Sequence, residues 1–421
     1  MQKREQRSIA VIGLGFVGLP LCQLFLQNGY TVHGIDVDEA KLKGIRTGNS
    51  NNPDVDGHFI QQTIRENRFF LHHTGKGIAG TEAVFICVPT PLTGSGNPEL
   101  IFVKKAVESI LPHLEAGQLI CLESTTYPGT TDELILPRLE EKGWTVGKDI
   151  FLAYSPERIN PGSHIPLKKI PKVVGGTTPQ CLGRISAIYR SVFDEVFEVS
   201  STRAAEMTKI LENTQRFINI SFINDFAILC EKMNIDVYEV IEAASTKPYG
   251  FSRYTPSAGI GGHCIPIDPL YLSWKAKEYN HETPFIHTAD AVNKKMPQYV
   301  TTKIKNLLKG GKTVSPPSIL LVGVAYKKDI GDVRESPAIP IIRLLVKDGF
   351  HVDYYDPFVP SLTVDSTEYV SIDRSALASV HYDLAVVITD HSTTPYETIK
   401  SHIPVVIDTK QLFLPASGTR S

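Results

Sequence analysis

Residues 8–18 read Ser-Ile-Ala-Val-Ile-Gly-Leu-Gly-Phe-Val-Gly, a short apolar run that leads directly into three spaced glycines. The run is typical of a buried parallel strand, and the helical periodicity that follows predicts a helix immediately after the glycines. In such a turn Gly13 permits the tight bend, Gly15 lets the backbone approach a pyrophosphate, and Gly18 lets the helix pack closely on the strand. N–H groups at the start of the helix would face the phosphates.

An acidic residue follows at the spacing of a dinucleotide site. Asp36 closes the next predicted strand, at the expected distance of about 20 residues. Its carboxylate would accept hydrogen bonds from a ribose diol and repel a 2′-phosphate, which favours NAD over NADP as the cofactor. The alternative is a glycine turn that binds no ligand. The residues expected to contact NAD here are Gly13, Gly15, Phe16, Val17, Gly18 and Asp36.

Composition excludes several classes of protein. A formal net charge of -2 gives no reason to expect a nucleic-acid or anionic-membrane partner. No stretch approaches the ~20 apolar residues that cross a bilayer. The six cysteines contain no C-x-x-C pair, which fits neither a disulfide framework nor a zinc site. We therefore expect a cytoplasmic protein that binds no metal.

The chain alternates between strand-like and helix-like stretches at both ends, and 421 residues suggest two or three domains. This alternation predicts an α/β fold with two Rossmann-like, doubly wound parallel sheets. Between them, residues 202–233 form a long helical pattern without Pro or Gly, and more helix extends to about residue 309. We predict a long central helix and a helical middle domain, with domain bounds 1–200, 201–310 and 311–421. The predicted strands of the first sheet are 8–12, 31–36, 83–88, 119–123 and 150–153, and those of the second begin at 318, 351, 384 and 405.

A cysteine lies in the glycine-rich stretch at residues 259–268. Glycines leave the sulfur of Cys264 little to pack against, so this is not a normal core position. Such a loop can bring backbone close to a substrate, and the carboxylate of Asp268 could hold a water or orient a neighbour. A nucleophilic thiol is the functional interpretation, and a buried structural cysteine is the alternative.

Three further motifs carry polar side chains at positions suited to chemistry. Lys209 and Asn213 are four apart on the long helix, so they could donate to a developing oxyanion, or they could simply form its solvated face. Glu157 follows a strand end and suits a general base, although a salt bridge with Arg158 explains it equally well. Thr125, at another strand end, could offer a hydroxyl to cofactor or water, or could cap a helix.

Together these motifs resemble the UDP-glucose/GDP-mannose dehydrogenase family over nearly the whole chain. The motifs that carry the resemblance are GLGFVG (13–18), CVPTP (87–91), STTYPGTT (124–131), SPERINPG (155–162), EMTKILENT (206–214), GGHCIPIDP (261–269) and GVAYKKDIGDVRESP (323–337).

The resemblance implies a four-electron oxidation of a sugar C6 hydroxyl to a carboxylate. Cys264 matches the nucleophile that holds the aldehyde as a thiohemiacetal and then as a thioester, which water hydrolyses. Lys209 and Asn213 match the oxyanion donors, and Glu157 matches the base in hydrolysis. Asp268 matches the carboxylate beside the nucleophile, and Thr125 matches a water-binding hydroxyl. The resemblance also adds Pro89, Thr90 and Thr125 to the NAD site, and it gives a substrate site of Glu157, Arg158, Lys209, Asn213, Arg253, Gly261, Lys327 and Arg334.

The finer identity of the sugar rests on local resemblance. The GGHC, STTYPGTT and DPLYL segments look like the subgroup that acts on UDP-N-acetylhexosamines. Within it, STTYPGTT and TKPYGF look closer to UDP-N-acetylglucosamine 6-dehydrogenases, with the N-acetylmannosamine and UDP-glucose enzymes as alternatives. Residues 253–259 depart from the run expected there, in a loop that should line the sugar site. The chain is also expected to form a homodimer or larger assembly, because its long helix carries an apolar stripe.

Two other kinds of protein share some of these features. A two-domain β-hydroxyacid dehydrogenase has the same cofactor domain and long helix but transfers one hydride without a nucleophilic thiol. A non-catalytic NAD-binding scaffold or sensor would keep only the glycine turn. The GGHC loop and the second α/β domain, whose GVAYKKD turn lacks the glycine fingerprint and is not expected to bind NAD, argue against the first. The chemically competent residues at all the matched positions argue against the second.

Overall fold

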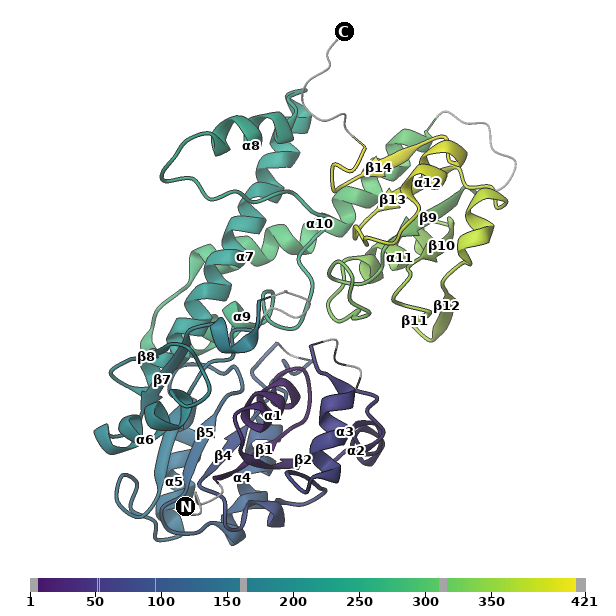
Figure 1. Ribbon diagram of the computed structural model, residues 1–421. Helices are drawn as coiled ribbons and strands as arrows, with labels where there is room; N and C mark the ends of the chain where they lie inside the picture. Colours follow the sequence, from purple (N-terminus) through teal and green to yellow (C-terminus); the bar gives the residue numbers. More distant parts are fainter. Residues whose placement is uncertain are drawn as a thin grey trace. The chain divides into compact units, whose positions relative to one another are not determined.

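A computed structural model describes residues 7–50, 52, 54–94, 96–159, 165–309 and 316–413. The chain divides into two compact units (Figure 1). The first comprises Met1–Glu212 and Leu270–His281, and the second comprises Asn213–Pro269 and Glu282–Ser421. The three-domain division at residues 200 and 310 stays an interpretation of the sequence.

The first unit is built on an eight-stranded sheet with the order β3-β2-β1-β4-β5-β6-β7-β8. Its first six strands are parallel, and the sequence predicts all of them except β3. The strands are β1 Ser8–Ile12, β2 Thr31–Ile35, β3 Phe69–His72, β4 Ala83–Ile86, β5 Leu119–Leu122, β6 Phe151–Tyr154, β7 Lys172–Gly176 and β8 Val196–Glu198. The helices are α1 Gly18–Gln27, α2 Glu39–Arg46, α3 Gly57–Arg65, α4 Ile101–Ile110, α5 Leu136–Glu141 and α6 Pro179–Tyr189.

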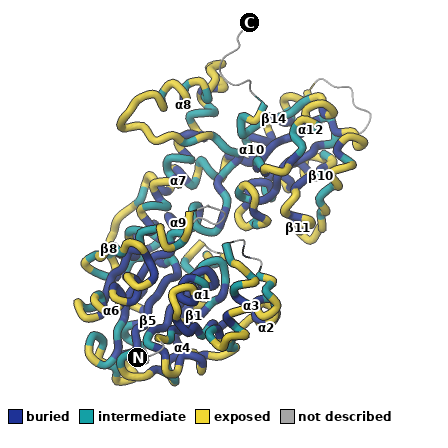
Figure 2. The backbone as a smooth tube through the Cα atoms, viewed as in Figure 1, coloured by how far each residue is buried: buried dark blue, intermediate teal, exposed yellow. Residues whose placement is uncertain are grey.

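Both faces of this sheet are buried (Figure 2). Alternate residues of one strand enter different cores: Ile9 and Val11 belong to one cluster, Ala10 and Ile12 to the other. Such double coverage is why the strands appear in the sequence as continuous apolar runs. The sequence did not predict β3, β7 or β8, and β7 pairs with β6 in the antiparallel sense.

The second unit contains a four-stranded parallel sheet with the order β10-β9-β13-β14. Leu321 and Val386 face one core while Leu320 and Val387 face the other, so this sheet is also covered on both faces. Its elements are β9 Ser318–Val322, α11 Ala338–Lys347, β10 His351–Tyr355, β13 Leu384–Val387, α12 Tyr396–His402, β14 Val406–Asp408 and a separate hairpin of β11 Ser361–Val364 and β12 Thr367–Val370.

Long helices lie between the two sheets in the sequence. The predicted central helix is confirmed as α7, Thr202–Lys232, with 31 residues. It begins in the first unit and continues in the second. The others are α8 Val237–Ser245, α9 Asp268–Ala276 and α10 Pro284–Leu308. Among the described residues, no helix is both long and apolar enough to span a membrane.

Candidate active site

The turn after β1 has the geometry that the three glycines predict. Gly13 has φ +90°, and a Cβ added there would lie 2.6 Å from the carbonyl oxygen of Cys87. A Cβ on Gly18 would lie 1.9 Å from the carbonyl oxygen of Gly13, so only glycine allows α1 to start this close to the strand. A Cβ on Gly15 would meet nothing within 4 Å. The second glycine therefore borders open space, where a pyrophosphate can approach the backbone.

Asp36 closes this turn from the end of β2. It is 6% exposed, and its Oδ2 accepts hydrogen bonds of 2.8 Å from both Leu14 N–H and Lys41 Nζ. Its Oδ1 accepts from Asp38 N–H at 3.0 Å. The carboxylate is thereby fixed beside the glycine turn, where a ribose diol would lie in a bound dinucleotide.

The loops after β4 and β5 are joined at the same edge of the sheet. The Thr90 hydroxyl donates to the Thr125 carbonyl at 2.7 Å, and Ser124 donates to the Val88 carbonyl at the same distance. The Tyr271 hydroxyl donates to the carbonyl of Thr90 at 2.6 Å. Thr90 and Thr125, both predicted to contact the cofactor, therefore lie together at the carboxyl edge where open α/β sheets bind ligands.

Helix α7 is held against the loop after β5 by a buried carboxylate. Glu206 accepts hydrogen bonds from the N–H of Gly129 and from both the N–H and the hydroxyl of Thr131. Burial raises the pKa of Glu206 to about 7, and these donors offset only part of that effect. One turn later on α7, Lys209 is 9% exposed and makes no hydrogen bond or ion pair with another described residue. A buried ammonium in that state is suited to an oxygen anion supplied by a ligand.

Glu157 does not form the loop salt bridge with Arg158 that the sequence left open. Its Oε1 accepts from the backbone N–H of Arg158 at 2.6 Å, and its Oε2 lies 3.3 Å from the Lys172 ammonium. The Arg158 guanidinium instead pairs with Glu212 of α7 at 2.7 Å. Glu157 and Arg158 therefore have different side-chain partners, although they are neighbours in one sequence motif.

Cys264 is set apart from the other cysteines. The remaining five are buried, whereas Cys264 is partly exposed. The carbonyl of Cys264 accepts the N–H of Asp268 at 2.8 Å, which turns the chain into α9. The Asp268 carboxylate then accepts a hydrogen bond from the Asn213 side chain. Asn213 therefore holds the start of α9, and the start of α9 in turn holds the turn that follows Cys264. In this way the predicted nucleophile Cys264, the carboxylate of Asp268 and the amide of Asn213 are linked within the second unit.

The glycines before Cys264 let this loop pack on the predicted substrate loop after β9. A Cβ on Gly261 would lie 2.8 Å from the Tyr326 Cβ, and Gly262 has φ +89°. Gly262 N–H also donates to the Arg334 carbonyl at 3.0 Å. The pKa of Tyr326 is raised, chiefly by burial and then by the charges of Asp332 and Cys264.

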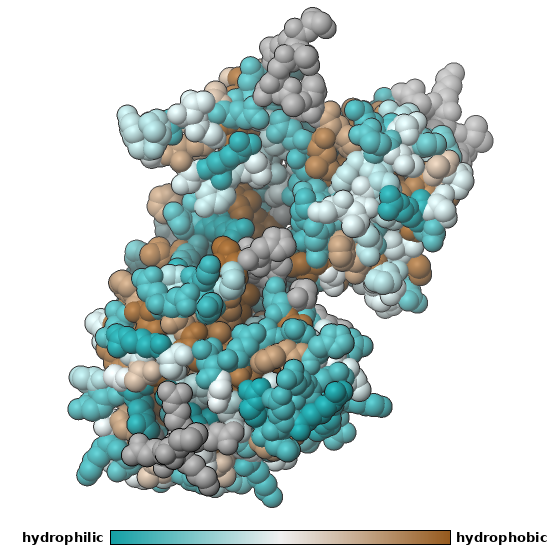
Figure 3. All heavy atoms as spheres, viewed as in Figure 1, coloured by the Kyte–Doolittle hydropathy of each residue, from teal (hydrophilic) through white to brown (hydrophobic). Residues whose placement is uncertain are grey.

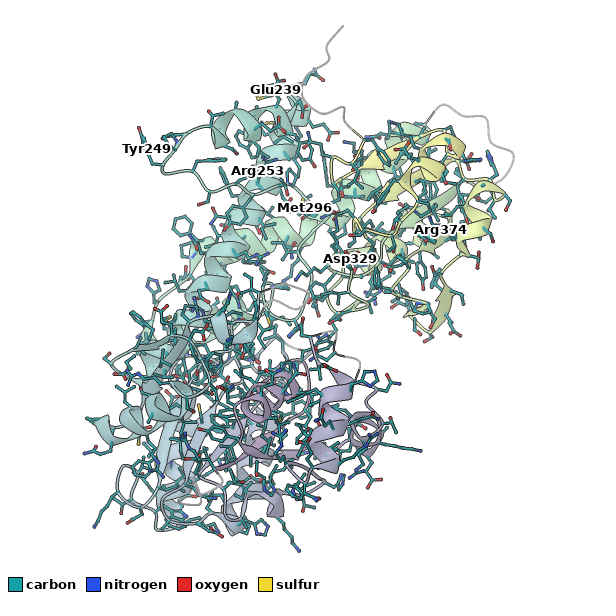
Figure 4. The ribbon with its side chains drawn as sticks, in the orientation of Figure 1. Glu239, Tyr249, Arg253, Met296, Asp329 and Arg374 are labelled. Carbon is teal, nitrogen blue, oxygen red and sulfur yellow. The ribbon has the colours of Figure 1, made fainter. Side chains whose placement is uncertain are left out.

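The predicted nucleotide-sugar contacts divide into two groups. Arg334 forms a 2.6 Å ion pair with Asp332 on the loop that packs against Gly261 and Gly262, and Lys327 belongs to the same loop. Arg253 is exposed on the long loop after α8 (Figure 4), and among the described residues no hydrogen bond or ion pair joins it to the Cys264 loop. Its predicted role in the sugar site stays a prediction.

The second sheet repeats the strand-end arrangement of the first but uses it differently. Asp356 ends β10 as Asp36 ends the corresponding strand β2, and its Oδ2 accepts the N–H groups of Val324 and Ala325 at 2.7 and 2.9 Å. His391 Nδ1 accepts from the Asp329 N–H at 2.8 Å, so its Nε2 carries the proton and donates to Asp356 at 3.0 Å. This carboxylate is fully buried and accepts hydrogen bonds from more protein donors than Asp36 does, on both of its oxygens, so it leaves less capacity for a ribose.

The sequence alone did not single out two polar groups of the first unit, the Thr126 hydroxyl and the Lys172 ammonium. The hydroxyl of Thr126, next to the predicted Thr125, is buried and has no hydrogen-bond partner among the described residues. Lys172 is the buried partner of Glu157. The position of Lys172 directly before the run Val-Val-Gly-Gly was a sign that its side chain could be buried. Its carboxylate partners lie too far away in the sequence to be recognised from it.

The fold and the glycine turn define an NAD-binding α/β protein, and comparison with known proteins identifies its family. Models of the UDP-glucose/GDP-mannose dehydrogenase family match residues 7–193 (NAD binding domain), 203–295 (central domain) and 320–415 (UDP binding domain). The chain belongs to this family and is an NAD-dependent nucleotide-sugar dehydrogenase.

Several known proteins are similar over almost the full length. Protein CapL of Staphylococcus aureus is 36% identical over 390 residues, 90% of each chain. UDP-N-acetyl-D-glucosamine 6-dehydrogenase of Salmonella typhi is 35% identical over 393 residues, 92% of this chain and 90% of that protein. The solved structure of UDP-D-ManNAc dehydrogenase from Pyrococcus horikoshii has a TM-score of 0.86 at 29% identity, covering 98% of this chain and 97% of that one.

The residues of the first unit fit the cofactor that the family implies. The open space at Gly15, the start of α1 and the fixed carboxylate of Asp36 would hold the pyrophosphate and ribose of NAD. When bound, NAD supplies the acceptor for hydride.

Proposed function

We propose that this chain oxidises the C6 hydroxyl of a UDP-N-acetylhexosamine, specifically UDP-N-acetylglucosamine, to the uronic acid. The observation that carries the reaction is the position of Cys264, the one cysteine of six that is not buried, on a loop tied to α7 through Asp268 and Asn213. A core cysteine would be enclosed like the other five. A nucleophile needs access to substrate and a rigid support.

The side chains suit a covalent route. The Cys264 sulfur attacks the C6 aldehyde to give a thiohemiacetal, which becomes a thioester when it loses hydride to the acceptor that bound NAD would supply. Lys209 and Asn213 donate hydrogen bonds to the oxyanions that develop on the sugar oxygen, and Thr125 binds water. Glu157 accepts the proton of the water that cleaves the thioester. Because the aldehyde stays attached to sulfur, it cannot leave between the two oxidations.

The choice of sugar rests on named relatives and on local sequence. Two relatives at 35% identity are UDP-N-acetyl-D-glucosamine 6-dehydrogenases, from Salmonella typhi and Pseudomonas aeruginosa. UDP-N-acetylmannosamine is the second candidate, because relatives at 33% identity carry that activity in their names. We propose that the loop at residues 253–259 decides between them. Its end is anchored to α7, since Asn224 Oδ1 accepts from the Ser257 N–H at 2.8 Å.

A substrate panel tests this assignment. Purified protein is given NAD and either UDP-N-acetylglucosamine, UDP-N-acetylmannosamine, UDP-N-acetylgalactosamine or UDP-glucose, and kcat/KM and product mass are measured. We expect UDP-N-acetylglucosamine to be preferred by at least about tenfold, the discrimination that one well-placed polar contact gives. A preference for another sugar of the panel would contradict the proposed substrate and retain the reaction. We also propose that the enzyme works as a cytoplasmic homodimer.

A further inference from the structure

Lys172, at the start of β7, is buried between two carboxylates. Its Nζ lies 2.6 Å from Glu123 Oε2 and 3.3 Å from Glu157 Oε2. The side chain of Lys172 is 4% exposed, that of Glu123 is fully buried, and that of Glu157 is 8% exposed. We call these three residues the carboxylate clamp. Lys172 begins β7, Glu123 directly follows β5, and Glu157 lies on the loop after β6, and these strands are three neighbours in the sheet.

Among the residues that the structure describes, the groups around the clamp add no second cation. From α6, the Tyr189 hydroxyl donates to Glu123 Oε1, and the Tyr189 ring centroid lies 5.3 Å from the ammonium. Cys87 of the β4 edge and Cys121 of β5 face the same charges, but burial raises the pKa of each thiol well above its usual range, so both stay neutral. Arg158, on the same loop as Glu157, is engaged by Glu212 of α7. One ammonium thus serves two carboxylates.

Charge is divided unequally within the clamp. Burial raises the pKa of Glu123 to about 7, although Lys172 partly offsets this effect. Burial alone would lower the pKa of Lys172, but the charges of Glu123 and then Glu157 outweigh it, so its pKa is raised and the ammonium persists. Glu123 therefore changes its charge near neutral pH. When Glu123 is protonated, its attraction to the Lys172 ammonium weakens, and Lys172 can interact more strongly with Glu157.

Glu157 is held from two sides. Oε1 accepts the backbone N–H groups of Arg158 and Ile159 at 2.6 and 2.5 Å, while Oε2 faces Lys172. Loop donors fix one oxygen and the sheet fixes the other. The Lys172 contact is the only side-chain donor to Glu157 among the described residues.

We propose that Lys172 is a positioning residue for thioester hydrolysis, holding the Glu157 carboxyl group in its orientation, while Glu123 competes for the same ammonium. This inference rests on the proposed function. In the step concerned, a water oxygen bonds to the thioester carbon, its proton passes to Glu157, and the carbon–sulfur bond breaks. The sulfur of Cys264 leaves with the bonding electron pair, and the sugar leaves as its carboxylic acid.

The clamp predicts opposite effects of its two outer members on the pH dependence of hydrolysis. In Lys172→Met, Glu157 loses its cation, so we expect hydrolysis to slow by about tenfold or more and its acid limb to move up by about one pH unit. In Glu123→Gln, the ammonium is left to Glu157 alone, so the acid limb should move down. Lys172→Arg keeps the charge and should restore hydrolysis to within about threefold of wild type.

Rapid mixing with UDP-N-acetylglucosamine and NAD provides the measurement. A burst of NADH followed by a slow steady rate, with the sugar thioester detected by mass on Cys264 after acid quenching, is the result expected for Lys172→Met. Lys169→Met, which removes an exposed lysine from the preceding turn, is the matched control and should show no burst. A general structural role would slow NADH release and hydrolysis together, without opposed shifts of the acid limb.

In Lys172→Met, Glu123 and Glu157 remain buried without their cation, which could unfold the protein. A double variant that also removes one carboxylate avoids this problem. Glu123→Gln/Lys172→Met removes a carboxylate and the ammonium together and should still accumulate the thioester. Wild-type hydrolysis in the double variant, or an unmoved acid limb in Glu123→Gln, overturns the inference. Wild-type protein that forms no acid from any UDP-sugar contradicts the proposed function instead, so the two failures are distinguishable.

Discussion

At the scale of single residues, Cys264 differs from the other five cysteines in its surroundings. Cys22 and Cys121 lie in the core of the first sheet, where burial raises the pKa of each thiol far above its usual range. Cys264 lies on a partly exposed loop shaped by glycines. Thiol reactivity depends on access and on thiolate formation, so the six sulfurs are not chemically equivalent.

Replacing the Cys264 sulfur should abolish formation of the uronic acid and leave NAD binding intact. In Cys264→Ala we expect uronic acid production to fall by at least about a thousandfold, as for loss of a catalytic nucleophile, with NAD binding unchanged. Cys230→Ala, a buried cysteine of the same unit, is the control and should keep its activity. Product mass and NAD titration provide the readouts, and acid production at the wild-type rate by Cys264→Ala would rule out the covalent route.

Residue roles were predictable where chemistry and local motif coincide. Cys264 and Asp268 could be singled out because their loop is unusual, and the structure links Asp268 to Asn213 as one constellation. Lys172 and Glu123 could not, because a buried ion pair between residues 49 positions apart leaves no local pattern. The exposed position of Arg253 was equally unpredictable, since its loop has no periodicity that fixes orientation.

At the scale of elements, two glycines of the turn between β1 and α1 serve different needs, Gly18 the folding of the turn and Gly15 the binding of the cofactor. A methyl group on Gly18 would collide with the Gly13 carbonyl, whereas one on Gly15 would meet nothing. We expect Gly18→Ala to lower the free energy of unfolding by about 2 kcal/mol or more. Gly15→Ala should keep wild-type stability and weaken NAD binding by at least about tenfold, because its methyl group stands where the pyrophosphate approaches.

Thermal unfolding and NAD titration of both variants test this separation. A Gly15→Ala protein that binds NAD as wild type would show that the open space is not the cofactor site. A Gly18→Ala protein of wild-type stability would show that the helix can move away from the turn.

The attachment of α7 to the loop after β5 should depend on pH. The folded protein binds the Glu206 proton more tightly than the unfolded chain, because the folded pKa of about 7 exceeds the ordinary value of 4.5. The protonated carboxyl therefore stabilises the fold at low pH, and this contribution disappears as the pH rises through about 7. Between pH 5 and pH 8 we expect the stability of wild type relative to Glu206→Gln to fall by about 1–3 kcal/mol.

Urea unfolding of wild type and Glu206→Gln at several pH values provides the check. Since other groups titrate equally in both proteins, the difference between them isolates Glu206. A difference that stays constant from pH 5 to pH 8 would contradict the burial of a protonated carboxyl.

Elements with strong periodicity were predictable, and weaker ones were not. The unbroken pattern at residues 202–233 gave α7 almost to the residue. Strand β7 begins with a charged lysine and ends in two glycines, neither of which favours strand, so tertiary pairing decides it. Strand β11 alternates exposed and buried residues over only four positions, and β12 contains no buried residue, so neither strand of this hairpin can be distinguished from a loop in the sequence.

At the scale of the whole molecule, the second half of α7 leaves an apolar stripe exposed. Phe222 and Leu229 are 62% and 50% exposed, and Met233, the residue after the helix, is 59% exposed. Phe222 stacks on Phe226 one turn away. Figure 3 shows hydrophobic atoms at the surface in the region of this helix. A row of this kind is typical of a subunit contact.

We expect the protein to sediment as a dimer or larger assembly at micromolar concentration. Phe222→Asp should shift it toward the monomer, because the stripe would then carry a charge into the contact. Phe197→Asp, which alters an equally exposed apolar residue of β8, is the control and should leave the assembly unchanged. A wild-type monomer at that concentration would contradict the homodimer.

The central claim is that one site carries out both oxidations while Cys264 holds the sugar. The most direct measurement is the amount of NADH formed at 340 nm per UDP-N-acetylglucosamine consumed, run to completion with the product mass determined. Two NADH and a uronic acid are the predicted result. One NADH per sugar, with an aldehyde or another two-electron product, would contradict the covalent four-electron mechanism and return the protein to single hydride transfer.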